Sequence, residues 1–400
     1  GTDLAVLKTG DESVYRYDQM GTHSYENSSM QTGTNSTSYY FSVASGDITN
    51  FFNEVDLNTP WDYHYENLDS RTILDRLAAV KYFVVKAGEE EYLPYGYDTL
   101  AAEVEKNDKL YRAYECKNAL PIGYTYDSYI PEEKYAKMST VEKQQALLQG
   151  VILSNSTVPE TTSEFNDREV PYKLVTGSGC REKDGKLIVT KENAQAKLVF
   201  DGLDECETYL ITEGVDYEAL SPRELISDKK WSKMTLYEQK KIQYENSTWR
   251  YWKESQKAYI DVTGQFLDKT ISIFTDKYNA YSGRSDFLCN TGYSEKGKKS
   301  ITLTFENTGV YSYKDMKVVC QPMKNIESQT SRLGTESLKD VKIKNHELTG
   351  SISVLKDKVL VISLPYSKGF QAYVDGQKTE LKQANTMYMA LELTKGDHEI

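Results

Sequence analysis

The sequence predicts an α+β multidomain fold: an N-terminal α/β unit, a jelly-roll-like β-sandwich with a helical insertion, and a smaller C-terminal β unit. Its 400 residues exceed what one hydrophobic core usually supports. Strand and helix patterns alternate as far as Val85, whereas from Val170 onward apolar residues recur with a period of two. The predicted domains are 1–129, 130–322 and 323–400, and the insertion covers 221–256.

Alternating elements build the predicted N-terminal unit. The stretches SVYRYD and YYFSV favour strands, and DITNFFNEV favours a short helix capped by Ser45. The run NLDSRTILDRLAAVKYFVV predicts a helix that leads directly into the strand Val80–Val85, and a hairpin is expected around Asn107 and Asp108. This order of strand, helix and strand is typical of an α/β layer.

Helix-start signals follow in the next stretch. Pro131 suits a first helical turn, where its absent N–H costs nothing. Ser139 and Glu142 form a capping box, which predicts a helix that ends at Gly150. The polar stretch 154–167 is typical of a linker or exposed loop.

The predicted sandwich consists of short strands separated by Gly-rich turns, a pattern typical of β-sandwiches and jelly rolls. Two capping boxes, Ser221 with Glu224 and Thr235 with Glu238, predict the helical insertion. Beyond it the strands resume. A helix at 323–333 and a final set of strands form the C-terminal unit.

Composition limits the partners that we expect. Hydrophobic residues make up 39% of the chain, its mean hydropathy is -0.62, and its longest apolar run is far shorter than the roughly 18 residues of a membrane span. A net charge of -12 opposes binding to nucleic acid and to anionic headgroups, and no Lys/Arg stripe is evident that would reverse it locally. We therefore expect no nucleic-acid partner.

No motif indicates a catalytic centre, a metal or a cofactor. The five Cys contain no C-x-x-C pair, so neither a zinc site nor a dense disulfide framework is expected, although a bridge from Cys180 to Cys206 stays open. Asp201, Asp204 and Glu205 lie close together, and a glycosidase needs only two carboxylates at the right separation. A solvated acidic surface is the alternative.

The stretch NSTWRYWKES supplies the candidate carbohydrate-binding residues Trp249, Tyr251 and Trp252. If these rings are exposed, they could stack on the apolar face of a sugar. In the alternative interpretation Trp249 and Trp252, three positions apart, lie on one helix face and fasten the insertion to the sandwich.

Four motifs in order resemble the YfhO family of bacterial membrane proteins. They are RLAAVKYFVV, NALPIGYTYDSYI followed by MSTVEKQQALLQGVIL, ISLPYSKGFQAYVDGQ, and the closing LELTKGDHEI. The resemblance spans nearly the whole chain. Phe370 stands where the family usually carries Trp, a conservative departure, and the region 221–256 matches no motif of the family.

The resemblance implies a polytopic parent protein, similar to GT-C glycosyltransferases, that transfers a polyprenyl-phosphate-linked sugar to a cell-wall polymer such as lipoteichoic acid. The acidic catalytic residue of such enzymes lies in an early extracytoplasmic loop between membrane helices, so no catalytic residue is expected in this chain. The implied partners are the membrane-embedded part of the same polypeptide, a cell-wall glycopolymer or glycan acceptor, and the polyprenyl-phosphate sugar held by the membrane domain.

On this basis we expect the extracytoplasmic domain of a membrane protein. Gly1 stands where a native chain would carry Met, and the final LTKGDHEI breaks off within a hairpin, so we expect a segment of a longer protein. Two alternatives remain: a non-catalytic carbohydrate-binding or adhesion module, for which the sandwich and 32 Tyr would suffice, and a glycoside hydrolase.

Overall fold

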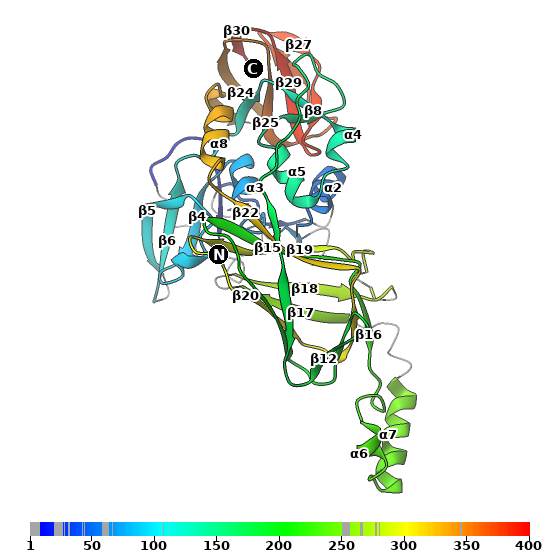
Figure 1. Ribbon diagram of the computed structural model, residues 1–400. Helices are drawn as coiled ribbons and strands as arrows, with labels where there is room; N and C mark the ends of the chain where they lie inside the picture. Colours follow the sequence, from blue (N-terminus) through cyan, green and yellow to red (C-terminus); the bar gives the residue numbers. More distant parts are fainter. Residues whose placement is uncertain are drawn as a thin grey trace. The chain divides into compact units, whose positions relative to one another are not determined.

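The computed structural model divides the chain into two compact units, here called unit 1 (Gly1–Asp167 with Gln321–Ile400) and unit 2 (Arg168–Cys320). The fold is α+β and rich in strands, as predicted (Figure 1). The structure describes residues 9–19, 27, 29–30, 33–41, 43, 45–57, 64–65, 67–106, 108–249, 257–264, 267–276, 278–279, 281–344 and 346–400.

The first sheet of unit 1 has the strand order β1-β4-β6-β5, in which β1 runs parallel to β4 and the other pairs are antiparallel. Its strands are β1 (Arg16–Gln19), β4 (Val80–Lys86), β5 (Tyr97–Lys106) and β6 (Lys109–Cys116). The parallel pair requires a crossover, and this connection contains β2 (Tyr39–Tyr40), α2 (Gly46–Glu54), β3 (His64–Tyr65) and α3 (Thr72–Leu77). The predicted hairpin is confirmed as β5 and β6.

Two helix starts were predicted from capping residues in unit 1. The capping box is confirmed: the backbone N–H of Glu142 donates to Ser139 Oγ (3.3 Å), and the N–H of Ser139 donates to the Glu142 carboxylate (2.8 Å) at the start of α5 (Thr140–Ala146). Ser45 occupies the N-cap position of α2, but its side chain makes no capping hydrogen bond. Pro131 ends a strand and occupies the N-cap position of α4 (Glu132–Tyr135), one residue before the first helical turn in which it was predicted.

The C-terminal strands belong to the same unit as the N-terminal sheet. β7 (Gly123–Tyr126) pairs antiparallel with β25 (Lys358–Pro365) in a sheet of order β28-β29-β25-β7. The unit boundaries therefore differ from the predicted divisions at 129/130 and 322/323, because this pairing joins segments that the sequence pattern assigned to separate domains. The other elements of this part are β8 (Tyr129–Pro131), β9 (Val151–Leu153), η3 (Glu90–Tyr92), α8 (Ile326–Gly334), β23 (Lys339–Lys344), β24 (Glu347–Val354), β26 (Ala372–Val374), β27 (Gln377–Thr379), β28 (Lys382–Ala384), β29 (Tyr388–Leu393) and β30 (Gly396–Glu399).

Unit 2 contains the predicted β-sandwich. Its sheets have the orders β10-β22-β15-β19, β11-β14-β20-β17-β18 and β12-β13-β21-β16, and their apolar side chains share one core cluster. In β14, every second residue is buried, as the period of two predicted. The strands are β10 (Arg168–Val170), β11 (Tyr172–Thr176), β12 (Cys180–Lys183), β13 (Lys186–Val189), β14 (Ala194–Phe200), β15 (Cys206–Glu213), β16 (Asp216–Ala219), β17 (Lys257–Thr263), β18 (Asp268–Phe274), β19 (Phe287–Ser294), β20 (Ser300–Phe305), β21 (Gly309–Ser312) and β22 (Asp315–Pro322).

The predicted helical insertion interrupts the sandwich between β16 and β17 as α6 (Asp228–Trp231) and α7 (Leu236–Trp249) (Figure 1). Thr235 and Glu238 make the reciprocal bonds of a capping box at the start of α7. Ser221 and Glu224 make the same bonds, but they close a turn that does not continue as a helix. All five Cys are buried and lie outside any disulfide bond, so Cys180 and Cys206 form no bridge.

Candidate binding groove

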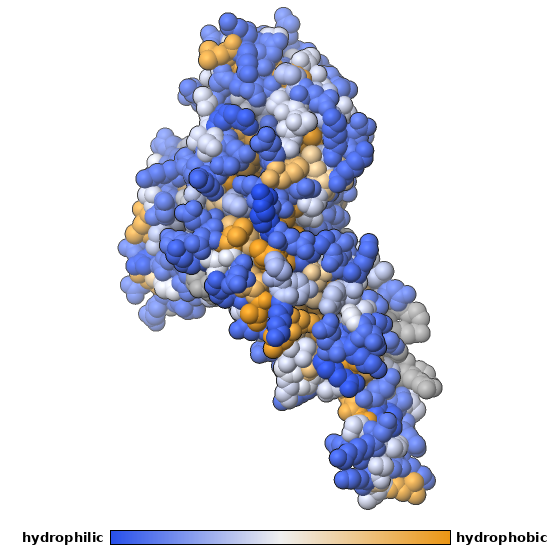
Figure 2. Space-filling model, viewed as in Figure 1, coloured by the Kyte–Doolittle hydropathy of each residue, from blue (hydrophilic) through white to orange (hydrophobic). Residues whose placement is uncertain are grey.

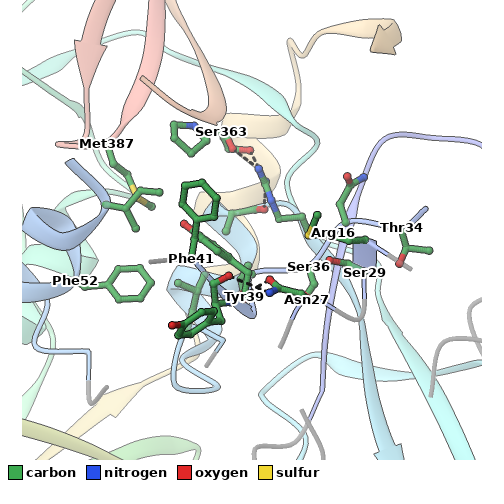
Figure 3. Close-up of a pocket in the computed structure, with 18 of the residues that line it drawn as sticks. Arg16, Asn27, Ser29, Thr34, Ser36, Tyr39, Phe41, Phe52, Ser363 and Met387 are labelled. Carbon is green, nitrogen blue, oxygen red and sulfur yellow. Dashed lines mark hydrogen bonds between the residues drawn. The ribbon is translucent and has the colours of Figure 1, made fainter. Parts of the chain in front are cut away.

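Unit 1 contains a groove of about 660 Å³ between the crossover segment, α2 and the ends of β25 and β29 (Figure 3). Aromatic and aliphatic side chains line much of it, together with hydroxyl and amide groups and one guanidinium. The lining residues are Arg16, Asn27, Ser29, Met30, Thr34, Asn35, Ser36, Thr37, Tyr39, Tyr40, Phe41, Ile48, Phe52, Leu68, Ala78, Ser363, Pro365, Met387 and Tyr388.

Polar side chains build one wall of the groove by fixing the backbone before α2. The Asn27 carboxamide both donates to the carbonyl of Tyr40 (2.9 Å) and accepts from its N–H (3.1 Å). The carboxamide of Asn35 donates to the carbonyl of Tyr15 (3.2 Å), and the N–H of Tyr17 in β1 donates to the carbonyl of Asn35 (3.0 Å). Asn27 therefore fixes the backbone at Tyr40, and the backbone of Asn35 holds the chain against β1.

Stacked rings support the base of the groove. The rings of Tyr39 and Tyr65, paired across β2 and β3, are stacked with centroids 4.5 Å apart. Phe52 of α2 meets Tyr65 edge to face at 4.8 Å. Two other lining residues, Tyr40 and Phe41, are 40% and 57% exposed. The lining thus combines two accessible rings with packed aromatic side chains.

Arg16 is the single charged residue among the described residues that line the groove. Its guanidinium donates to the carbonyl of Ala78 (2.7 Å), to the carbonyl of Ser363 (2.7 Å) and to Ser363 Oγ (3.3 Å) (Figure 3). Burial lowers the pKa of Arg16 from its usual value, but an arginine remains protonated at neutral pH. The groups to which Arg16 donates are uncharged, so its guanidinium favours an anionic group in the groove, although the nearby Asp18 carboxyl offsets part of its charge.

A buried carboxyl group lies behind the same wall. Asp18 accepts hydrogen bonds from the Thr37 hydroxyl (2.5 Å) and, at 3.4 Å, from the Thr37 N–H and the Ser36 hydroxyl. Burial raises the pKa of Asp18 to about 7, although these hydrogen bonds and the charge of Arg16 act in the opposite direction. Asp18 therefore anchors two lining residues rather than facing a ligand itself.

The predicted carbohydrate-binding residues are not part of this groove. Trp249, the last residue of α7, is partly buried and packs against the core cluster of unit 2. Tyr251 and Trp252 lie outside the described residues. The structure therefore gives Trp249 a packing contact, and the sugar-binding role of the three residues stays a prediction.

The acidic residues considered for glycoside hydrolysis lie on the surface of unit 2. Asp201 is paired with Lys299 at 3.1 Å, and its side chain is 95% exposed. Asp204 accepts from the N–H of Gly297 (2.7 Å) and is paired with Lys296 at 3.2 Å. Both are thus solvated ion pairs. Among the described residues, no group of three or more His, Cys, Asp or Glu side chains could hold a metal ion.

Sequence reasoning did not single out the groove residues. The run YYF is predicted to be part of a strand, in which neighbouring residues normally face opposite sides. In the structure, Tyr40 and Phe41 are both exposed. The signal available in the sequence was the run of three consecutive aromatic residues at positions 39–41. Arg16 gave none, because its partners Ala78 and Ser363 are distant in sequence.

The fold is α+β, and unit 1 has a largely aromatic groove whose described lining includes one cationic side chain. No helix among the described residues is long and apolar enough to cross a membrane. The profile of the family described as "Bacterial membrane protein YfhO" matches residues 3–400, and this chain belongs to that family.

A curated relative gives the same result. The protein named "Uncharacterized protein YfhO" from Bacillus subtilis (strain 168) is 21% identical over 398 residues, which cover 99% of this chain. The chain spans 41% of the length of that relative. No solved structure matches this chain.

Proposed function

We propose that this chain is an extracytoplasmic domain of a YfhO-like membrane glycosyltransferase and that it binds the acceptor of the reaction. The donor would be a polyprenyl-phosphate-linked sugar, and the acceptor a cell-wall polymer such as lipoteichoic acid. The family match over residues 3–400 supports association with a bacterial membrane. The observation that carries acceptor binding is the groove, in which accessible rings lie near one cation.

The chemistry of the groove suits a glycopolymer that carries phosphate. The rings of Tyr40 and Phe41 offer flat apolar surfaces to the C–H face of a sugar, while the Arg16 guanidinium attracts a phosphate oxygen. The charge of the whole chain, -12, would repel a polyanion elsewhere, so the groove is the part of unit 1 best suited to such an acceptor.

The test uses the full-length membrane protein in detergent, with donor and acceptor supplied. Phe41→Ala should raise the KM for the acceptor about tenfold, equivalent to ~1.4 kcal/mol, and leave kcat nearly unchanged. Tyr281→Ala is the matched control, because this ring is also about half exposed (49%) but lies in unit 2. Unchanged kinetics for Phe41→Ala would exclude the groove as the acceptor site.

A non-catalytic carbohydrate-binding or adhesion module is the second candidate, since the same accessible rings favour it. It predicts that the chain binds glycans and that the full-length protein lacks transfer activity. Measuring both binding and transfer with the same Phe41→Ala variant separates the two functions. A glycoside hydrolase gains no support from Asp201 and Asp204, because both are surface ion pairs.

A further inference from the structure

The helical insertion of unit 2 is internally braced along one face of α7. The carboxamide of Gln239 donates to the carbonyl of Trp231 (3.0 Å), and the N–H of Arg223 donates to Asn246 Oδ1 (3.2 Å). The Arg223 guanidinium lies over the Trp231 ring, 4.4 Å from its centroid. These contacts join α7 to the segment that precedes it, so the insertion forms a helical hairpin with defined inner and outer faces.

The outer face of the hairpin carries apolar and basic residues together. Leu236, Tyr237 and Tyr244 are 69%, 79% and 70% exposed, and Lys240 and Lys241 are exposed beside them. Each of these positions lies three or four residues from at least one other, so the set covers one side of the helix. Figure 2 shows hydrophobic residues among hydrophilic ones on this hairpin. No residue of α7 is buried.

The hairpin is also locally basic within an acidic chain. Between Asp228 and Trp249 there are five lysines and three carboxylates, whereas the whole chain has a net charge of -12. The sequence alone indicated no basic stripe, because these lysines are spread over two helices. At physiological salt, charges further away than about 8 Å are largely screened, so the local excess of lysine governs contacts at this face.

We propose that this outer face docks on the surface of an anionic lipid bilayer. Tyr side chains favour the membrane–water interface, an exposed Leu gains free energy there, and lysine stems can lie along the apolar region with their ammonium groups among the headgroups. Each Lys near an anionic surface adds to the electrostatic attraction. An anionic bilayer is the partner that would contact both the apolar and the basic residues of this face. The family is also one of bacterial membrane proteins. The inference does not depend on the proposed transfer reaction.

The experiment measures partition of the full 400-residue chain onto vesicles. Vesicles that contain phosphatidylglycerol should bind it at least about tenfold better than vesicles of phosphatidylcholine alone. Replacing the apolar residues (Leu236→Ser with Tyr237→Ser and Tyr244→Ser) or the basic ones (Lys240→Glu with Lys241→Glu) should each lower partition about tenfold or more. Leu355→Ser, equally exposed at 79% but in unit 1, is the control and should bind as the unaltered chain does.

A fluorescent label adds a readout of depth. The five native Cys are buried, so a cysteine introduced by Tyr244→Cys can be labelled selectively with an environment-sensitive dye. Its emission should shift to the blue on phosphatidylglycerol vesicles, whereas the same label on Leu355→Cys should not shift. Equal partition of the unaltered chain and both outer-face variants overturns the proposal. The proposal is also overturned if the chain binds a soluble phosphate polymer as well as it binds the vesicles and the dye emission does not shift. That result would indicate a polymer as the partner.

Discussion

The Arg76 guanidinium and the Glu327 carboxylate form an ion pair between residues 251 positions apart, with Nη2 2.7 Å from Oε1. Arg76 lies in α3 and its side chain is fully buried, whereas Glu327 lies in α8 and is one third exposed (34%). Burial lowers the pKa of Arg76, but nearby Cys116 and Glu327 raise it, and the net shift is upward. The pair joins the N-terminal and C-terminal parts of unit 1.

Removing the acidic partner should destabilise unit 1. Glu327→Ala leaves a buried guanidinium without its carboxylate, and we expect a loss of about 3 kcal/mol in the free energy of unfolding. Asp201→Ala is the control, because the Asp201–Lys299 pair is on the surface and should contribute less than about 1 kcal/mol. Chemical denaturation of both variants measures the difference. Equal losses would mean that the buried ion pair contributes no more to the free energy of unfolding than the surface pair does.

This ion pair also shows why the domain boundaries could not be predicted from the sequence. Periodicity and capping signals are local, and they correctly gave the α5 capping box and the alternating burial of β14. The pairing of β7 with β25 depends on contacts more than two hundred residues apart, which no single-sequence pattern encodes. The groove also depends on long-range contacts, since the Arg16 guanidinium is positioned by its hydrogen bond to the distant carbonyl of Ser363.

The Asp18 carboxyl should make stability depend on pH in a defined direction. Burial raises its pKa from 3.8 to about 7, so between these values the folded chain keeps a proton that the unfolded chain has released. This group therefore lowers stability as the pH rises through that window, and its contribution is constant above it. Asp18→Asn keeps an oxygen that can accept from Thr37 but cannot ionise.

The measurement compares chemical denaturation of the unaltered chain and Asp18→Asn at both ends of this window. Relative to the unaltered chain, the variant should gain stability toward the upper end, because only the unaltered chain must ionise a buried group. The difference between the two proteins cancels the other carboxylates, which titrate in both. A difference that does not change with pH would show that Asp18 does not titrate in this window.

Trp249 tests the packing interpretation of the insertion. Because its ring is partly buried against the core of unit 2, Trp249→Ala should cost about 2 kcal/mol, less than the ~3–5 kcal/mol of fully buried aromatic residues. Tyr244→Ala in the same helix is 70% exposed and should change stability by less than about 0.5 kcal/mol. Denaturation and glycan-array binding are measured together. Unchanged stability with lost glycan binding would instead favour the sugar-binding role.

The last prediction is that this chain alone does not transfer sugar. Transfer from a polyprenyl phosphate needs a catalytic acid or base beside the anomeric carbon, at the depth where the phosphate meets the membrane. Under the proposed function that group belongs to the membrane-embedded part, and this chain contributes acceptor binding. The purified chain is incubated with undecaprenyl-phosphate-linked N-acetylglucosamine and lipoteichoic acid, beside the full-length protein in detergent. Turnover by the chain alone would place the catalytic residue within residues 1–400 and overturn the division of roles that we propose.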